Sequence, residues 1–308
     1  MGTIEILNSL AMIFIMIIPG FILKKRHIID EHQTKGLSSI IVNITWPCLV
    51  INAMQVPYTK EIFDGCKYIF FLLFIIFIAV FILAAIAHKV FKLERSQAGI
   101  LAFMLIFSNT GFIGMPVINA LYGKEALFYA SMVEMVNDIL IFTIGVVLIQ
   151  ISAGLKAKLN FKDFINPGLI GIFLGFILFL TSTTLPKFLG DSVSMIGAAT
   201  SPLSMFVIGS QLGDIKFKEI AGDWKIYGFS FVKLLIVPAV AIFIVRILLG
   251  EVSLLSTVVM MSFAMPAAAV TVIFAQQFNG DVKFATKGVL ISTLLCLATI
   301  PVFAILLR

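Results

Sequence analysis

Charged residues are scarce in this sequence and make up 12% of its 308 positions. Soluble globular domains contain about 25% charged residues and are about half apolar. Here 60% of the residues are hydrophobic, and the mean hydropathy is +1.12. These values exclude an ordinary soluble domain. They predict an all-α polytopic membrane protein whose main surroundings are the lipid bilayer.

Cysteine is also rare, with only Cys48, Cys66 and Cys296 in the chain. Their number is odd and their spacing matches no metal-binding motif, so neither a disulfide framework nor a metal site is expected. We interpret the three as small packing residues.

Several motifs that carry chemistry are missing. No GxxxxGK[ST] sequence is present, which argues against a protein driven by ATP. The net charge of +6 is spread over short loops and not gathered on one face, which argues against a nucleic-acid partner. No residues form a catalytic pattern, so we expect no enzyme activity and no cofactor.

Long apolar segments dominate what is present. About 20 apolar residues are needed to cross the hydrocarbon core of a bilayer. Ten segments meet this need, with short connections that leave no room for a soluble domain. They cover residues 6–23, 37–54, 68–87, 98–121, 126–151, 168–185, 192–212, 226–249, 252–278 and 284–307.

The basic residues predict the orientation of these spans, because cytoplasmic loops are enriched in Lys and Arg. Of the 22 basic residues, 15 lie after the first, third, fifth, seventh and ninth spans. Six lie on the opposite side, and Lys233 lies within a span. The imbalance predicts that both termini are on the non-cytoplasmic side of the cell membrane.

The sequence contains an internal repeat. Three short matches lie 155 or 156 residues apart: 20–23 with 175–178, 45–47 with 200–202, and 122–125 with 278–281. Each half then holds five spans, and an odd number forces the second half to enter the membrane in the opposite sense. Inverted repeats of this kind are typical of secondary transporters. A channel or a membrane enzyme stays open, although neither requires this construction.

Two spans are interrupted near their centres. Residues 107–116 of the fourth span contain Asn-Thr, two glycines and Pro116, and residues 264–268 of the ninth span contain Pro266. Such breaks aim helix ends at a ligand when they face a cavity. We expect a half-helix to begin near each proline, and the N–H groups of 115–117 to bind an anion together with Asn109. The alternative is that Asn109 only bridges loosened backbone.

Two acids lie within the fifth span. Glu134 and Asp138 are four residues apart and share one helix face, with Asn137 beside them. Each acid costs about 2.5–3.5 kcal/mol at the centre of a span, so such residues usually face a cavity, pair or carry protons. We predict a proton-coupling pair. The alternative is that the acids neutralise Lys233 or cap a neighbouring helix.

Prolines also interrupt the second and seventh spans, at Pro47 and Pro202, each two residues after a threonine. The simple interpretation is a helix kink whose backbone is satisfied by threonine hydroxyls. A functional interpretation adds Asn43, one turn before Pro47, as a polar group lining a cavity.

The broken spans resemble those of a known family. The fourth span contains NTGFIGMPVINALYG at 109–123, and the ninth contains AMPAAAVTVIFAQQF at 264–278. The first is similar to the fourth-span signature of the auxin efflux carrier family, which includes plant PIN carriers and bacterial malate permease-like transporters. The second resembles its ninth-span counterpart. With ten spans and an inverted repeat, the resemblance covers the whole chain.

The resemblance implies a fold like that of the sodium/proton antiporters, with repeats at 1–155 and 156–308. Spans 1, 2, 6 and 7 would form a scaffold, and spans 3–5 and 8–10 a moving transport domain. A homodimer through the scaffold spans is one arrangement that this fold allows. The predicted substrate-binding residues are Asn43, Asn109, Thr110, Gly111, Gly114, Met115, Pro116, Met265, Pro266 and Ala267.

Three functional hypotheses follow. The first is a carrier or facilitator of small organic anions, such as malate-like or auxin-like acids, working by elevator-type alternating access with H⁺ or no coupling ion. The second is a Na⁺-coupled carrier of the bile-acid type, since neutral oxygens at a crossover can bind Na⁺. The third is a membrane sensor that keeps the fold without transport.

Overall fold

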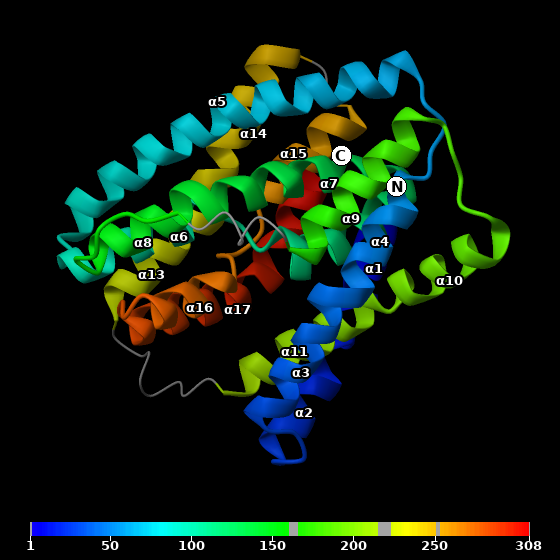
Figure 1. The fold of residues 1–308 in the computed structure, drawn as a ribbon. Coiled ribbons are helices and arrows are strands. Elements are labelled where there is room, and N and C mark those ends of the chain that lie inside the picture. Colours follow the sequence, from blue (N-terminus) through cyan, green and yellow to red (C-terminus); the bar gives the residue numbers. More distant parts are fainter. Residues whose placement is uncertain (1, 160–165, 215–222, 251–252, 308) are drawn as a thin grey trace. The chain divides into compact units, whose positions relative to one another are not determined.

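The structure is a computed structural model that describes residues 2–159, 166–214, 223–250 and 253–307 (Figure 1). Lys162, Lys216, Lys218 and Arg308, which entered the comparison of basic residues, lie outside this range. The predicted orientation therefore stays a prediction.

The described residues form helices and no β-strand, which confirms the predicted all-helical class. Three apolar helices are shorter than a full span: Arg95–Ile106, Pro167–Leu180 and Leu254–Phe263. Among the described residues seven helical stretches are long and apolar enough to cross a membrane: Thr3–Lys25, Glu31–Met54, Lys60–Phe91, Thr110–Ser152, Lys187–Gly213, Trp224–Leu249 and Val282–Leu306. The chain is thus a multi-pass membrane protein.

The chain folds as two compact units, and unit 1 comprises Met1–Ile69, Gly111–Met135 and Lys162–Ile215. Its helices pack closely where glycines allow it. A Cβ atom at Gly20 would collide with the carbonyl oxygen of Phe206, and one at Gly209 with that of Ile17. The helices of this unit are α1 (Thr3–Ile15), α2 (Ile17–Lys25), α3 (Glu31–Ile40), η1 (Ile41–Thr45), α4 (Trp46–Met54), α9 (Pro167–Leu180), α10 (Lys187–Ala198) and α11 (Thr200–Gly213).

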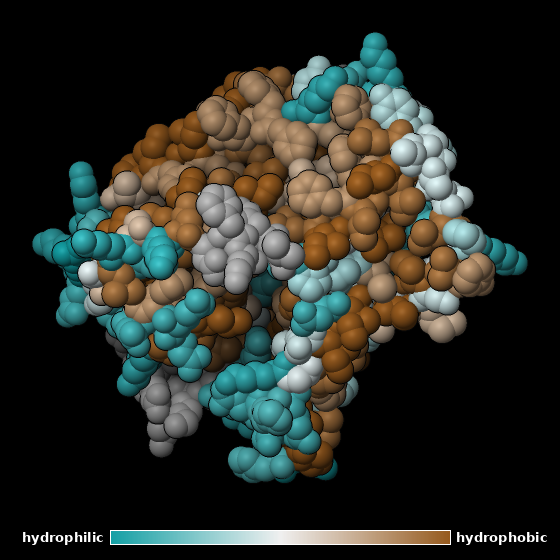
Figure 2. All heavy atoms as spheres, in the orientation of Figure 1, coloured by the Kyte–Doolittle hydropathy of each residue, from teal (hydrophilic) through white to brown (hydrophobic). Residues whose placement is uncertain are grey.

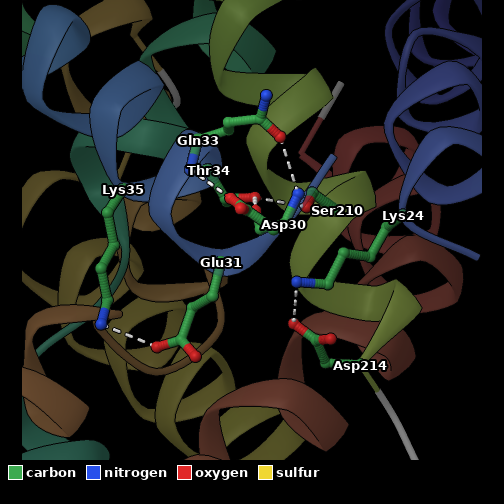
Figure 3. A network of polar contacts seen from close by, with 8 residues as sticks. All are labelled: Lys24, Asp30, Glu31, Gln33, Thr34, Lys35, Ser210 and Asp214. Carbon is green, nitrogen blue, oxygen red and sulfur yellow. Dashed lines mark hydrogen bonds and ion pairs between the residues drawn. The ribbon is translucent and has the colours of Figure 1, made fainter. Parts of the chain in front are cut away.

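Polar residues fix the ends of α2, α3 and α11 in unit 1 (Figure 3). Asp30 accepts a 2.7 Å hydrogen bond from the Gln33 backbone N–H, which caps α3 and starts it at Glu31, six residues before the predicted span. The hydroxyls of Thr34 and Ser210 hydrogen-bond at 2.7 Å and join α3 to α11. Hydrophilic residues gather over this end, whereas apolar side chains cover much of the remaining visible surface (Figure 2).

Unit 2 comprises Phe70–Thr110, Val136–Phe161 and Lys216–Arg308. Figure 1 shows α6 beside α8 and α16 beside α17, and both pairs are in contact. Aromatic rings fill part of the core, with Phe103 and Phe107 4.7 Å apart between centroids. The helices wholly within this unit are α6 (Arg95–Ile106), η3 (Ile141–Gly145), α8 (Val146–Ser152), α13 (Trp224–Phe231), η5 (Val232–Ile236), α14 (Val237–Leu249), α15 (Leu254–Phe263), α16 (Val270–Gln277) and α17 (Val282–Leu306).

Three further helices pass from one unit to the other: α5 (Lys60–Phe91), η2 (Thr110–Gly114) and α7 (Met115–Leu140). Gly123 has φ +77° and divides α7 into two helical pieces. Only glycine adopts this conformation without strain, so the end of the fourth span and the start of the fifth meet at this residue. The helices η1, η2, η3 and η5 are π-helical, a conformation that often occurs at functional positions.

Candidate functional site

The two broken spans meet in unit 2 through extended backbone. Helix α6 ends at Ile106 and α15 ends at Phe263, and Ser108 and Ala267 then pair as an antiparallel bridge. The Asn109 N–H donates to the Pro266 carbonyl at 2.8 Å, and the Ala268 N–H donates to the Phe107 carbonyl at 3.1 Å. Each segment thus satisfies backbone groups of the other, as the interior of a membrane protein requires. We call residues 107–110 and 264–269 the crossover.

A buried lysine supports the crossover from η5. Lys233 is 0% exposed, and its ammonium donates to the Leu105 carbonyl at 3.0 Å and to the Ser108 hydroxyl at 2.9 Å. Both acceptors are neutral oxygens, so these two bonds do not cancel a positive charge on Lys233. When protonated, Lys233 places a positive charge against Ser108, the residue before Asn109, which favours the binding of an anion at the crossover. The sequence analysis considered Lys233 as a charge that Glu134 and Asp138 could neutralise, and did not predict its bonds to the crossover.

Polar side chains from three helices gather around the crossover. The Asn137 amide of α7 donates to the Thr110 hydroxyl at 3.1 Å, and the Ser292 hydroxyl of α17 accepts from the Ala267 N–H at 3.3 Å. Asn109 and Thr110 are buried, as is Asp138 one position after Asn137. The structure thus brings the predicted residues of both broken spans together. Sequence reasoning missed Ser108 and Ser292, because a lone serine in an apolar helix carries no distinct signal.

The α-helix of the fourth span begins at Met115, beside Pro116, but it does not leave the free N–H groups that the prediction required. Helical structure resumes at Thr110, and α7 follows η2 without a gap, so the N–H groups of 115–117 lie inside a helix. The π-turn of η2 directly precedes Pro116. Its wider hydrogen-bond pattern accommodates the bond that the proline, which has no N–H, cannot donate. In the ninth span α16 begins at Val270, because the Pro266 carbonyl and the Ala268 N–H are held in extended pairing.

Unit 1 holds a second group of predicted residues. A Cβ atom at Gly111 would lie 3.2 Å from the Glu134 carboxylate and 3.9 Å from the Trp46 ring, and one at Gly168 would collide with that ring. Trp46 is buried, and its indole N–H has no partner among the described residues. The ring is fixed between two glycines, with a donor available for a ligand. The only feature of the sequence that pointed to Trp46 is its position directly before Pro47, where the second span is interrupted.

The remaining predicted residues differ in exposure. Asn43 is exposed, and its amide donates to the Ser39 carbonyl at 2.8 Å. The others are buried in the broken spans: Gly114, Met115, Pro116 and Met265. The described residues contain no group of three or more His, Cys, Asp or Glu side chains placed to hold a metal. The arrangement can bind a small charged molecule through hydrogen bonds.

Comparison with known proteins identifies the family. The family model "Membrane transport protein" matches residues 5–304. An uncharacterized transporter of Methanocaldococcus jannaschii is 25% identical over 96% of this chain and 97% of its own length. The uncharacterized transporter YfdV of Escherichia coli K12 is 22% identical over 96% of both chains.

A mouse relative is named for signalling and not for transport. The lysosomal cholesterol signaling protein of Mus musculus is 23% identical over 95% of this chain, which corresponds to 36% of the mouse protein. The family match covers nearly the whole chain and agrees with the apolar helices described above. The chain therefore belongs to the membrane transport protein family, the auxin efflux carrier family that its broken spans resemble, and it is a membrane transporter.

Proposed function

We propose that the protein moves small organic anions, mono- or dicarboxylates, across the cell membrane. The observation that carries this proposal is the buried ammonium of Lys233 beneath the crossover. Intramembrane ionisable residues usually mark substrate pathways, and the protonated form of Lys233 favours a carboxylate as ligand. Asn109 and Thr110 add neutral polar groups, which bind an anion without the desolvation cost of a second buried cation.

The proposed substrate-binding site is the crossover, which lies within unit 2. The Lys233 ammonium binds Ser108, the residue directly before Asn109. A single ammonium matches one carboxylate, which favours monoanions or a partly protonated diacid. The assignments of Gly111, Gly114, Met115, Pro116 and Asn43 to substrate binding stay predictions.

The proposed mechanism is elevator-type alternating access. The division of the chain into two compact units supports it, because a carrier of this kind needs bodies that can move separately. Unit 1 contains the helices that the resemblance assigns to the scaffold, and the crossover backbone pairing lies in unit 2. The exact boundary between scaffold and transport domain stays a prediction.

The proposed topology has ten spans in two inverted repeats, with both termini outside the cytoplasm. Seven long and three shorter apolar helices among the described residues are compatible with ten crossings, if the shorter helices belong to broken or short spans. Gly123 and Asn279 occupy equivalent positions in the two repeats, and both have positive φ, +77° and +55°. A positive φ at both positions supports the repeat.

Transport assays in proteoliposomes test the proposal. Wild-type protein should take up labelled malate or indole-3-acetate faster than empty liposomes, and unlabelled carboxylate should compete. Uptake is compared with no gradient, with a pH gradient and with a Na⁺ gradient, which separates a facilitator, an H⁺-coupled carrier and a Na⁺-coupled carrier. A panel of cations and sugars serves as the control. Uptake of those compounds without any carboxylate would overturn the anion assignment.

A membrane sensor is the second candidate. The likeness to the mouse lysosomal cholesterol signaling protein favours it, since that relative carries a signalling role in its name. A sensor binds its ligand without net flux. Thermal-shift binding of a carboxylate or a sterol, combined with absence of flux for every ligand that binds, would favour the sensor over the carrier.

A further inference from the structure

Three buried hydroxyl groups of unit 1 have no hydrogen-bond partner among the described residues. They belong to Thr45, Thr200 and Ser204, which are 4%, 0% and 0% exposed. Buried polar groups are nearly always satisfied in native proteins, so three such groups in one region call for a common explanation.

The second and seventh spans run antiparallel in contact with each other. The Asn52 amide donates to the Ser194 hydroxyl at 3.4 Å. One turn further, a Cβ atom at Gly197 would lie 2.8 Å from the backbone N and Cα of Leu49. The register continues to the other end of the pair, where Thr34 and Ser210 hydrogen-bond (Figure 3).

This register brings the residues that carry the hydroxyls to neighbouring levels of the two spans. Thr45 lies one turn before Leu49, and Thr200 lies one turn after Gly197, at the contact between η1 and α11. Gly197, Thr200 and Ser204 are spaced i, i+3 and i+7 and therefore share one face of the seventh span. The three hydroxyls thus belong to a single buried layer of the crossing.

The prolines of both spans add acceptors at the same level. Pro47 and Pro202 have no N–H to donate to the carbonyls four residues earlier, which belong to Asn43 and Ala198. Extended from the contact of Leu49 with Gly197, the antiparallel register places Asn43 within one residue of the level of Pro202, and Pro47 within one residue of the level of Ala198. Each proline lacks the backbone N–H donor but keeps its carbonyl acceptor. At the crossing, oxygen acceptors therefore outnumber the N–H and O–H donors.

We propose that this layer is a binding site for a monovalent cation, with Na⁺ as the best fit, formed by the hydroxyls of Thr45, Thr200 and Ser204 and the carbonyls of Asn43 and Ala198. Hard cations take neutral oxygen ligands, and carbonyls of interrupted helices coordinate Na⁺ in other transporters. The ligands come from both halves of the chain, so the ion joins the second span to the seventh. Its role is to stabilise unit 1, independently of substrate.

Na⁺ binding to the purified full-length protein tests the proposal without any substrate. Protein in choline chloride is titrated with NaCl or KCl at constant ionic strength, and both the thermal midpoint and ²²Na⁺ binding are measured. We expect a saturable rise of the midpoint with Na⁺, a smaller rise with K⁺, and saturable ²²Na⁺ binding. Thr45→Val and Thr200→Val should each weaken Na⁺ binding at least about tenfold, since each removes an oxygen ligand of a charged group.

Ser131→Ala is the matched control, because it also removes a fully buried hydroxyl, but one that donates to the Leu127 carbonyl at 2.7 Å. Its Na⁺ response should equal that of the wild type. If the threonine variants fail to fold, Ser204→Ala provides the milder change, with the same expected loss of Na⁺ affinity.

Three outcomes overturn the proposal. One is a wild type without saturable ²²Na⁺ binding, which would leave bound water as the partner of the hydroxyls. Another is Na⁺ binding that persists in the folded variants of all three hydroxyl residues. The third is an equal loss in Ser131→Ala. None of these depends on carboxylate transport, so failure here is distinguishable from failure of the proposed function.

Discussion

Two crossings of proline-containing spans differ in how they satisfy the backbone. In unit 1, Pro47 lies near the start of α4 after the π-turn η1, and Pro202 lies in the first turn of α11, so both spans stay largely helical. In unit 2 the chain leaves the helix at 107–109 and 264–269, and the two extended segments pair. The first crossing keeps its backbone bonds within helices, whereas the second exchanges backbone bonds between its two segments and adds those of the Lys233 ammonium.

The difference shows that a proline in an apolar run does not by itself predict a full break. Proline is tolerated in the first turn of a helix, where its missing N–H would be unused. A full break requires a second segment that can supply backbone partners, as Pro266 and Ala268 do for Asn109 and Phe107. Variants can test this contrast, and we order them by expected effect.

The largest effect is expected for Lys233→Met. It leaves the Leu105 carbonyl and the Ser108 hydroxyl without their buried donor, which should lower the free energy of unfolding by about 2–5 kcal/mol. Thermal unfolding in detergent measures this change. Lys287→Met is the control, since its partly exposed pair with Asp223 at 3.4 Å should contribute less than about 1 kcal/mol. Equal midpoints for the two variants would show that Lys233 does not hold the crossover.

Gly197→Ala should strain the crossing of unit 1 by about 1–3 kcal/mol, because the new methyl group would press on the Leu49 backbone. Gly190→Ala in the same helix has no atom nearer than 3.7 Å and should be neutral or slightly stabilising. Chemical or thermal unfolding of the pair gives the comparison. Similar destabilisation in both would mean that helix propensity, not close packing, decides the effect.

Asn109→Ala should weaken carboxylate binding by about 1–3 kcal/mol through loss of a hydrogen bond to a charged group. The unliganded protein should melt near the wild-type temperature. Binding is followed by the ligand-induced thermal shift, with Asn119→Ala, in the same span, as control. Normal anion binding by Asn109→Ala would remove this side chain from the substrate site.

The smallest change in stability is expected for Glu134→Gln combined with Asp138→Asn, which keeps shape and removes both charges. If the pair carries protons, transport by the double variant loses its dependence on pH, because no carboxyl group remains within the fifth span to titrate. Uptake rates over a range of pH measure this. Glu125→Gln, at an exposed position of α7, should keep the wild-type profile. A double variant with the wild-type profile would show that the pair is structural.

Sequence reasoning predicted the membrane class, the family and the breaks of the fourth and ninth spans, because hydropathy and Gly-Pro interruptions are local signals. It missed that helical structure resumes already at Thr110 in the fourth span and only at Val270 in the ninth, because both starts depend on the pairing of Ser108 with Ala267, which are distant in sequence. The role of Lys233 was hidden for the same reason. Its acceptors, Leu105 and Ser108, are distant in sequence and are neutral groups that no charge pattern reveals.

Hydrogen exchange at the two backbone bonds of the crossover reports how often the crossover opens. The amide protons of Asn109 and Ala268 are locked between segments that are buried in the protein. They can exchange with solvent deuterium only when those segments separate and water enters. Their exchange rates therefore measure how often the centre of unit 2 comes apart, and a ligand held there would slow both protons together.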